Sequence, residues 1–265
     1  MKVLSLWLRD DFEATWLGKD PFTEVLALKG VTVRRVAQRR TFRFEKFGVG
    51  FFAKIHSGPG WPEIFKNLIV GKLPVLDASN EFIAARKLVD LGINTLVVAA
   101  FGVRGKNPAR RQSFIVTDEI VDAISLEDFC SEWAEHSPAF GQKLTLLKDV
   151  ASLARKLHVG GVVHRDFYLC HILLNRGPGN THGSLVLIDL HRALIRKQTS
   201  YRSLVKELGA LYFSSMDIGL SSRDYLRFLA IYFGLTPREV LENKNQLIAA
   251  VCKRAEKLYA KRNRL

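Results

Sequence analysis

Cysteine is scarce in this chain of 265 residues, and the three that occur, Cys130, Cys170 and Cys252, lie far apart. An odd number without a CxxC pair favours neither a disulfide framework nor a zinc site, so we expect a reducing compartment. Long apolar runs are also missing. The longest stretch without a charged residue, Leu91–Val103, has 13 residues. Because a membrane-spanning helix needs about 20, we expect a soluble or peripheral protein.

Acidic residues are few relative to basic ones. The chain has 26 Asp and Glu against 40 Lys and Arg, which gives a net charge of +14. Such an excess attracts anions but says nothing about the fold. The candidate partners are nucleotides, nucleic acid, an anionic membrane surface, phosphorylated glycans and acidic proteins. Nucleic acid is disfavoured because the sequence holds no helix-turn-helix, aromatic RNA-binding motif or zinc finger.

Hydrophobic periodicity separates a β-rich first part from a helical second part. Strands are expected at 31–36, 41–45, 51–55, 95–103 and 113–117, with one main helix at 80–91. Helices are then expected at 126–133, 142–158, 201–213, 222–233 and 244–261, and a hairpin at 171–174 and 185–190 around Gly177-Pro178-Gly179-Asn180. This order is typical of an α+β fold. We expect two lobes: a small β-rich N-lobe, residues 1–118, and a larger, mainly helical C-lobe, residues 119–265.

Two strings in the second part have the pattern of phosphoryl transfer. His164-Arg165-Asp166 resembles the catalytic loop of kinases, and the apolar strand that ends at Asp189 resembles the strand before D-F-G. In this chemistry one carboxylate orients the acceptor hydroxyl and another holds Mg²⁺ on the ATP phosphates. We expect Asp166 to be the catalytic carboxylate and Asp189 the metal ligand. The alternatives are a helix or turn cap for Asp166 and a strand-end turn for Asp189.

Lys54 ends a string, Phe51-Phe52-Ala53-Lys54, that resembles the V-A-I-K strand whose lysine binds ATP phosphates. The alternative is a lysine at a strand edge with its stem on apolar neighbours. Its carboxylate partner is expected on the next helix, where Glu81 is favoured because it opens a well-patterned helix. Glu63 is the second candidate, but it follows Lys54 by only nine residues, across Gly58-Pro59-Gly60.

The glycine-rich loop that covers the phosphates in protein kinases is missing. Gly48 and Gly50 lie too close to Lys54 for another strand to fit between them. The turn in the equivalent position, near Gln38, holds no glycine. The turn is followed by Arg39 and Arg40. These two arginines would supply positive charge to the phosphates instead, or they are ordinary surface residues.

The segments after the two carboxylates also depart from protein kinases. His171 stands where those enzymes have a metal-binding Asn. Because Mg²⁺ prefers oxygen ligands, His171 binds metal weakly, contacts phosphate, or only structures the loop. The segment from Asp189 to the helix near Tyr201 is short and lacks A-P-E. Little room is left for a peptide-docking platform, which favours a small-molecule or glycan acceptor.

Nearly the whole chain resembles the lipopolysaccharide core heptose kinases of the Kdo/WaaP family, in which His171 and Leu190-His191 are normal. The matching strings are 20–22, 52–56, 72–76, 113–117, 164–171, 188–193 and 210–214. The resemblance implies a bilobal protein-kinase-like fold that uses ATP and Mg²⁺ to phosphorylate the first heptose of the inner core, an anionic glycolipid, at the cytoplasmic face of the inner membrane. The alternatives are a related small-molecule, lipid or protein kinase, a pseudokinase, and a basic nucleic-acid-binding protein.

The end of the sequence is a basic segment on a predicted helix. Its cations are Lys253, Arg254, Lys257, Lys261, Arg262 and Arg264. One interpretation is a solvated helix end whose cations suit the helix dipole. The other is a contact with the anionic membrane surface or the glycolipid acceptor. Packing on the helical lobe and an acidic soluble protein partner stay open.

Overall fold

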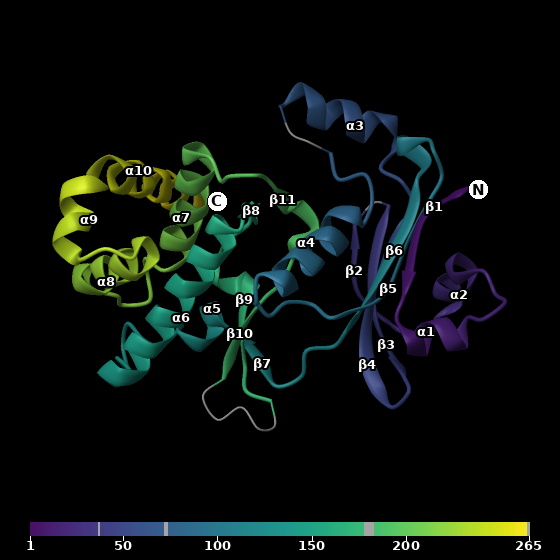
Figure 1. The fold of residues 1–265 in the computed structure, drawn as a ribbon, viewed down its shortest axis with the longest axis horizontal. Coiled ribbons are helices and arrows are strands. Elements are labelled where there is room, and N and C mark those ends of the chain that lie inside the picture. The colour runs from purple at the N-terminus through teal and green to yellow at the C-terminus, as the bar shows by residue number, and fades with distance from the viewer. Residues whose placement is uncertain (37, 72–73, 178–182, 264–265) are drawn as a thin grey trace. The chain divides into compact units, whose positions relative to one another are not determined.

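The computed structural model describes residues 1–36, 38–71, 74–177 and 183–263 (Figure 1). The described residues form two compact units, Met1–Arg86 with Leu96–Ile120 and Lys87–Thr95 with the residues from Val121 onward. The expected lobe boundary at residue 118 stays a prediction. Three features named above lie outside the described residues: Lys72-Leu73, the loop Pro178-Gly179-Asn180, and Arg264.

A six-stranded antiparallel sheet, in the order β1-β5-β6-β4-β3-β2, forms the first unit (Figure 1). Its strands are β1 (Val3–Leu8), β2 (Val31–Val36), β3 (Arg39–Lys46), β4 (Val49–His56), β5 (Val98–Arg104) and β6 (Gln112–Asp118). The five predicted strands are confirmed, because their β-branched or alternating residues suit a half-buried sheet. The sequence does not predict β1, which is apolar at nearly every position and lacks that alternation.

The two faces of this sheet carry different helices. α1 (Asp10–Thr15) and α2 (Pro21–Ala27) bury Phe12 and Phe22 in a core that also contains Ala53 of β4. On the other face α4 (Ser79–Asp90) stacks Phe82 on Phe101, with 4.2 Å between the ring centroids. Successive side chains of a strand point to opposite faces, so Lys54 lies on the α4 side. The main helix of the first part is confirmed as α4.

Helices dominate the second unit, which confirms the α+β fold class. They are α5 (Leu126–Phe129), α6 (Phe140–Val159), α7 (Tyr201–Ser214), α8 (Ser222–Phe233), α9 (Pro237–Asn243) and α10 (Asn245–Arg262). The length predicted for the first of these is wrong: α5 ends after one turn, and turns fill the segment to Trp133. The described helices include none that is long and apolar enough to cross a bilayer.

Short strands position the two kinase-like strings. The predicted hairpin is confirmed as β9 (Ile172–Asn175) paired with β10 (Ser184–Leu187), and β7 (Ala123–Ser125) joins β9. β8 (Val162–Val163) pairs with β11 (Leu194–Ile195). Because the first string follows β8 and the second precedes β11, this pairing brings the two strings side by side.

Candidate active site

Lys54 on β4 forms an ion pair with Glu81 in the first turn of α4. Lys54 Nζ lies 2.5 Å from Glu81 Oε1, and the side chain of Glu81 is 1% exposed. Its second oxygen, Oε2, is buried and has no hydrogen-bond partner among the described residues. Glu63, the other candidate, is exposed on α3 (Gly60–Ile69) and accepts a hydrogen bond from Asn67. The structure therefore brings Lys54 together with Glu81.

Arg39 and Arg40 open β3 and are half-buried. The guanidinium of Arg40 lies over the ring of Phe42, 4.4 Å from its centroid, and donates to Thr32 Oγ1 at 3.2 Å. These contacts tie Arg40 to the sheet surface, as the surface alternative expects. A contact of Arg39 or Arg40 with ATP phosphates stays a prediction.

Asp166 lies in a loop after β8 that is held by buried polar groups. Its carboxylate accepts hydrogen bonds from Arg192 Nη1, at 2.7 and 3.0 Å from its two oxygens. The buried His164 ring donates from Nε2 to the carbonyl of Ile188 and accepts the N–H of Asp166 at Nδ1. Burial lowers the pKa of His164, in keeping with this neutral tautomer. One imidazole thus links the Asp166 loop to the residue before Asp189.

Glu207, a buried carboxylate on α7, fastens the same loop. It is 1% exposed and accepts the backbone N–H groups of His164 at 2.6 Å and Arg165 at 2.9 Å. Arg165 has φ +74°, a left-handed conformation that is unusual for a residue with a side chain. Such a conformation persists only where its surroundings enforce it. The two hydrogen bonds that the backbone N–H groups of His164 and Arg165 donate to the Glu207 carboxylate supply that restraint.

Asp189 follows β10 and also has a left-handed backbone, with φ +62°. His191 Nδ1 lies 2.5 Å from Asp189 Oδ1, and His171 Nε2 lies 3.4 Å from Oδ2. His171 Nδ1 donates to the carbonyl of Asp166 at 2.7 Å. Hydrogen bonds to the Cys170 side chain and to that carbonyl outweigh burial and raise the pKa of His171 to about 9. His171 therefore bridges the candidate catalytic residue and the candidate metal ligand.

Arg192 and Glu207 are site residues that the sequence does not predict. Arg192 lies inside one of the family strings, but its partner Asp166 is 26 residues earlier. Glu207 precedes the buried stretch Leu208–Leu211 of α7, so an acidic residue beside an apolar helix face was a visible signal. Neither sequence pattern indicates the partner residue, because the Arg192–Asp166 contact and the contacts of Glu207 with the Asp166 loop form only in the folded structure.

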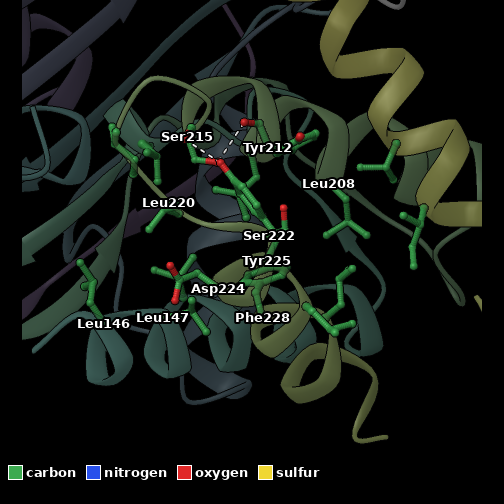
Figure 2. A pocket seen from close by; sticks show the side chains of 18 of the residues that line it. Leu146, Leu147, Leu208, Tyr212, Ser215, Leu220, Ser222, Asp224, Tyr225 and Phe228 are labelled. Carbon is green, nitrogen blue, oxygen red and sulfur yellow. Dashed lines mark hydrogen bonds between the residues drawn. The ribbon is translucent and has the colours of Figure 1, made fainter. Parts of the chain in front are cut away.

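A separate apolar cavity of about 400 Å³ lies among the helices of the second unit (Figure 2). Its wall is mainly leucine and aromatic side chains from α6, α7, α8 and α10, including Leu147, Leu208 and Phe228. The hydroxyl of Tyr225 at the wall donates to the carbonyl of Ser215 at 2.9 Å. The cavity therefore presents mainly apolar surface and lies within the size range of ligand pockets.

Asp224, the third residue of α8, forms a capping box with the N-cap residue Ser221 at the edge of this cavity. Its carboxylate lies 3.0 Å from Lys143 Nζ and accepts hydrogen bonds from the amide and hydroxyl of Ser221. Burial by itself raises the pKa of Asp224, but the bonds from Ser221 and the Lys143 ammonium group lower it to about 2. Asp224 therefore stays ionised at neutral pH and ties α6 to α8.

The cations of α10 divide between two environments. Lys253, Lys257 and Lys261 recur every fourth residue and are exposed, and we call these three the basic stripe. Arg262 pairs with Asp217, whereas Arg254 packs against Gly209 of α7 and is half-buried. The basic segment therefore presents the basic stripe to solvent and turns two arginines toward the protein.

Comparisons with known proteins agree with this geometry. The lipopolysaccharide core heptose(I) kinase WaaP of Pseudomonas aeruginosa is 45% identical over 263 residues, 98% of either chain. The Escherichia coli enzyme of the same name is 42% identical over 95% of this chain and 96% of its own. A solved structure, WaaP in complex with acyl carrier protein, has a TM-score of 0.83 at 41% identity and covers 97% of this chain and 100% of that one. The model of the lipopolysaccharide kinase (Kdo/WaaP) family matches residues 23–232, and the chain belongs to that family.

Proposed function

We infer that this chain is a lipopolysaccharide core heptose(I) kinase, a phosphotransferase that moves the γ-phosphoryl group of ATP to a heptose hydroxyl. The observation that carries the inference is its identity of 41% to 45%, over nearly the whole chain, with three kinases of that name. The kinase-like placement of the two strings supports it.

The direct test is phosphoryl transfer with purified components. Core oligosaccharide with an unphosphorylated first heptose should gain one phosphate in the presence of ATP, measured by mass spectrometry. A core truncated before that heptose is the matched control and should stay unmodified. Equal transfer to both, or none to the complete core, would contradict the inference.

Asp166 acts in this reaction by orienting the acceptor hydroxyl and accepting its proton. Such a group contributes about 10²- to 10⁴-fold to the rate, provided that its position is fixed. The support is that His164, Glu207 and Arg192 hold the Asp166 loop and carboxylate, while the side chain stays 17% exposed. Arg192 positions the carboxylate through contacts to both oxygens.

The donor set at Asp189 fits Mg²⁺. A carboxylate is a hard oxygen ligand, and the Asp189 side chain is 28% exposed. Mg²⁺ sites in kinases use one or two carboxylates together with substrate phosphates. When bound, the ion would neutralise charge on the transferred phosphoryl group. His191 and His171 orient the Asp189 carboxylate, and Asp189 would hold the ion.

Lys54 binds the α- and β-phosphates of ATP, and Glu81 positions the lysine. The support is the 2.5 Å ion pair between β4 and α4, which leaves the lysine side chain 26% exposed. Arg39 and Arg40 add positive charge on β3. The family uses ATP, so these residues complete a nucleotide site on the first unit.

The enzyme works in the cytoplasm as a peripheral protein of the inner membrane, because its acceptor is an anionic glycolipid anchored there. The basic stripe supports this location, since each cation near an anionic leaflet contributes about 1 kcal/mol. Vesicles with anionic lipid should sediment the wild type at low salt and release it at high salt. Reversing all three stripe lysines to Glu should reduce sedimentation. The matched control reverses three exposed lysines elsewhere, Lys29, Lys148 and Lys156. Equal losses would leave the stripe without a role.

The protein partner is an acyl carrier protein, as in the related WaaP complex. Two features support it: the net charge of +14 suits an acidic partner, and the apolar cavity suits an acyl chain. In calorimetry, the acylated carrier should bind this chain more tightly than the same carrier without its acyl group. Equal affinities would rule out the cavity as the acyl site, and no binding of either form would rule out the partner.

A further inference from the structure

The helix α3 in the first unit has an apolar face that the described residues of this unit leave uncovered. Its large apolar side chains recur at helical spacing: Trp61, Phe65, Leu68 and Ile69, with exposed fractions of 48%, 56%, 52% and 84%. We call these four side chains the α3 face. The rings of Trp61 and Phe65 stack, with 5.7 Å between their centroids. Only Ile64 of this helix is buried.

An amphipathic helix of a globular protein ordinarily turns its apolar stripe toward the core. α3 instead exposes most of its apolar side chains to solvent. The polar residues Glu63 and Asn67 bond to each other along the helix. Contiguous apolar surface of this kind marks a contact with a membrane or with another protein rather than a random exposure.

Charge around the α3 face identifies the contact. Lys66 lies on the helix, and α3 packs against the short helix η1 (Pro108–Arg110), which ends at the exposed Arg110 and follows the exposed Lys106. Glu63 is the one acidic residue in the described residues of α3 and η1. Tryptophan and phenylalanine between cations are typical of a helix that lies in the interface of an anionic bilayer. An acidic partner protein would also match the charge, and binding of such a partner is an outcome of the test below.

We propose that the α3 face inserts into the headgroup region of an anionic phospholipid bilayer and brings the first unit to the membrane. This inference deepens the proposed function and rests on it, because a membrane-anchored acceptor gives the contact its purpose. The basic stripe of α10 acts by charge and weakens with salt. The α3 face acts by burial of apolar area, so its share of binding persists at high salt.

Sedimentation of the full chain with vesicles of phosphatidylethanolamine and phosphatidylglycerol tests the proposal. The variant Phe65→Glu with Ile69→Glu should lower the partition coefficient at least about tenfold, since burial of each large apolar side chain is lost. The control variant, Leu17→Glu with Leu26→Glu, adds the same charge at residues that are 80% and 55% exposed. It should bind like the wild type. A neutral variant, Phe65→Gln with Ile69→Gln, should lose the binding that remains at high salt.

Fluorescence places the helix in the bilayer. Lipids brominated on their acyl chains should quench Trp61, and Trp61→Phe should remove the quenched signal while leaving binding intact. Equal sedimentation of the wild type and both α3 variants, or no quenching of Trp61, would overturn the proposal. Loss of acyl carrier protein binding with vesicle binding intact would assign the α3 face to the protein partner and would overturn it too.

Activity separates this proposal from the kinase assignment. On a water-soluble, delipidated core acceptor, the α3 variants should match the wild type in kcat and KM, but on acceptor in vesicles they should be slower. If the wild type itself fails on the soluble acceptor, the proposed function fails. The sedimentation and quenching results still decide the role of α3.

Discussion

The ion pair between Lys54 and Glu81 gives the sharpest test of the nucleotide site, because its two partners have different surroundings. In Lys54→Met the Glu81 carboxylate loses its cation at a position where the wild-type side chain is 1% exposed, and its Oε2 already lacks a hydrogen-bond partner among the described residues. Breaking a buried pair on one side costs about 3–5 kcal/mol. Because the Lys54 side chain is 26% exposed and water reaches the pair, we expect the lower end, about 3 kcal/mol. That loss corresponds to a fall in Tm of about 6–12 °C.

A double mutant separates stability from catalysis. Adding Glu81→Leu to Lys54→Met removes the unpaired carboxylate, so urea titration should recover the free energy of unfolding to within about 1 kcal/mol of the wild type. Phosphoryl transfer should stay lost, because no lysine is left to bind the phosphates. The matched control is the double-mutant cycle of Lys54→Met with Glu63→Gln. In this cycle the effects of the two mutations on the free energy of unfolding and on kcat/KM should be additive.

The pairing would be refuted by two results. One is a Lys54→Met protein whose stability falls by less than about 1 kcal/mol, which would mean that Glu81 is solvated without the lysine. The other is a double mutant that is no more stable than Lys54→Met. Coupling of Lys54 to Glu63 instead would move the partner from α4 to α3.

Three further predictions concern the second unit. Asp189→Ala should abolish Mg²⁺-dependent ATP binding in calorimetry, and unchanged binding would exclude the metal role. Glu207→Gln should lower the free energy of unfolding in urea titration by about 1.5–3 kcal/mol and should change kcat more than KM. Glu207→Asp should restore part of both losses. An unchanged kcat would exclude Glu207 as a positioning residue. The pKa of Asp224 is about 2 in the folded chain, against 3.8 as the ordinary value, so the unfolded chain binds more protons at this group. The ionised Asp224 therefore stabilises the fold above pH 3.8, and this stabilisation is lost as the pH falls toward 2. Asp224→Asn should therefore flatten the acid limb of stability against pH, and an identical slope would contradict the assignment.

The parts of the site that the sequence predicts are the ones with local signals. The string around Asp166 and the strand before Asp189 are short, contiguous patterns, and Lys54 ends a strand with period-2 neighbours. Glu81 follows from the helix in which it lies, and the observed pair with Lys54 agrees with that choice over Glu63. The β-rich and helical parts follow from periodicity in the same way.

The parts that the sequence does not predict depend on packing between distant segments. Glu207 binds amides 43 and 42 residues earlier, and nothing in its neighbourhood on α7 indicates those partners. The sequence does not predict α3 for another reason. Gly58-Pro59-Gly60 indicates a loop, and the helix Gly60–Ile69 that begins at the last of these residues has only ten residues. The exposure of its apolar side chains is visible only in the folded structure.

The most direct test of the central claim is phosphate transfer to a defined core oligosaccharide by Asp166→Asn beside the wild type. We expect the wild type to add one phosphate to the first heptose, with the product located by mass spectrometry and ³¹P NMR. The variant should bind ATP with unchanged affinity and melt at a similar temperature, yet lose about 10²- to 10⁴-fold in kcat. A variant that transfers phosphate at a rate near that of the wild type would contradict the claim that Asp166 carries the chemistry.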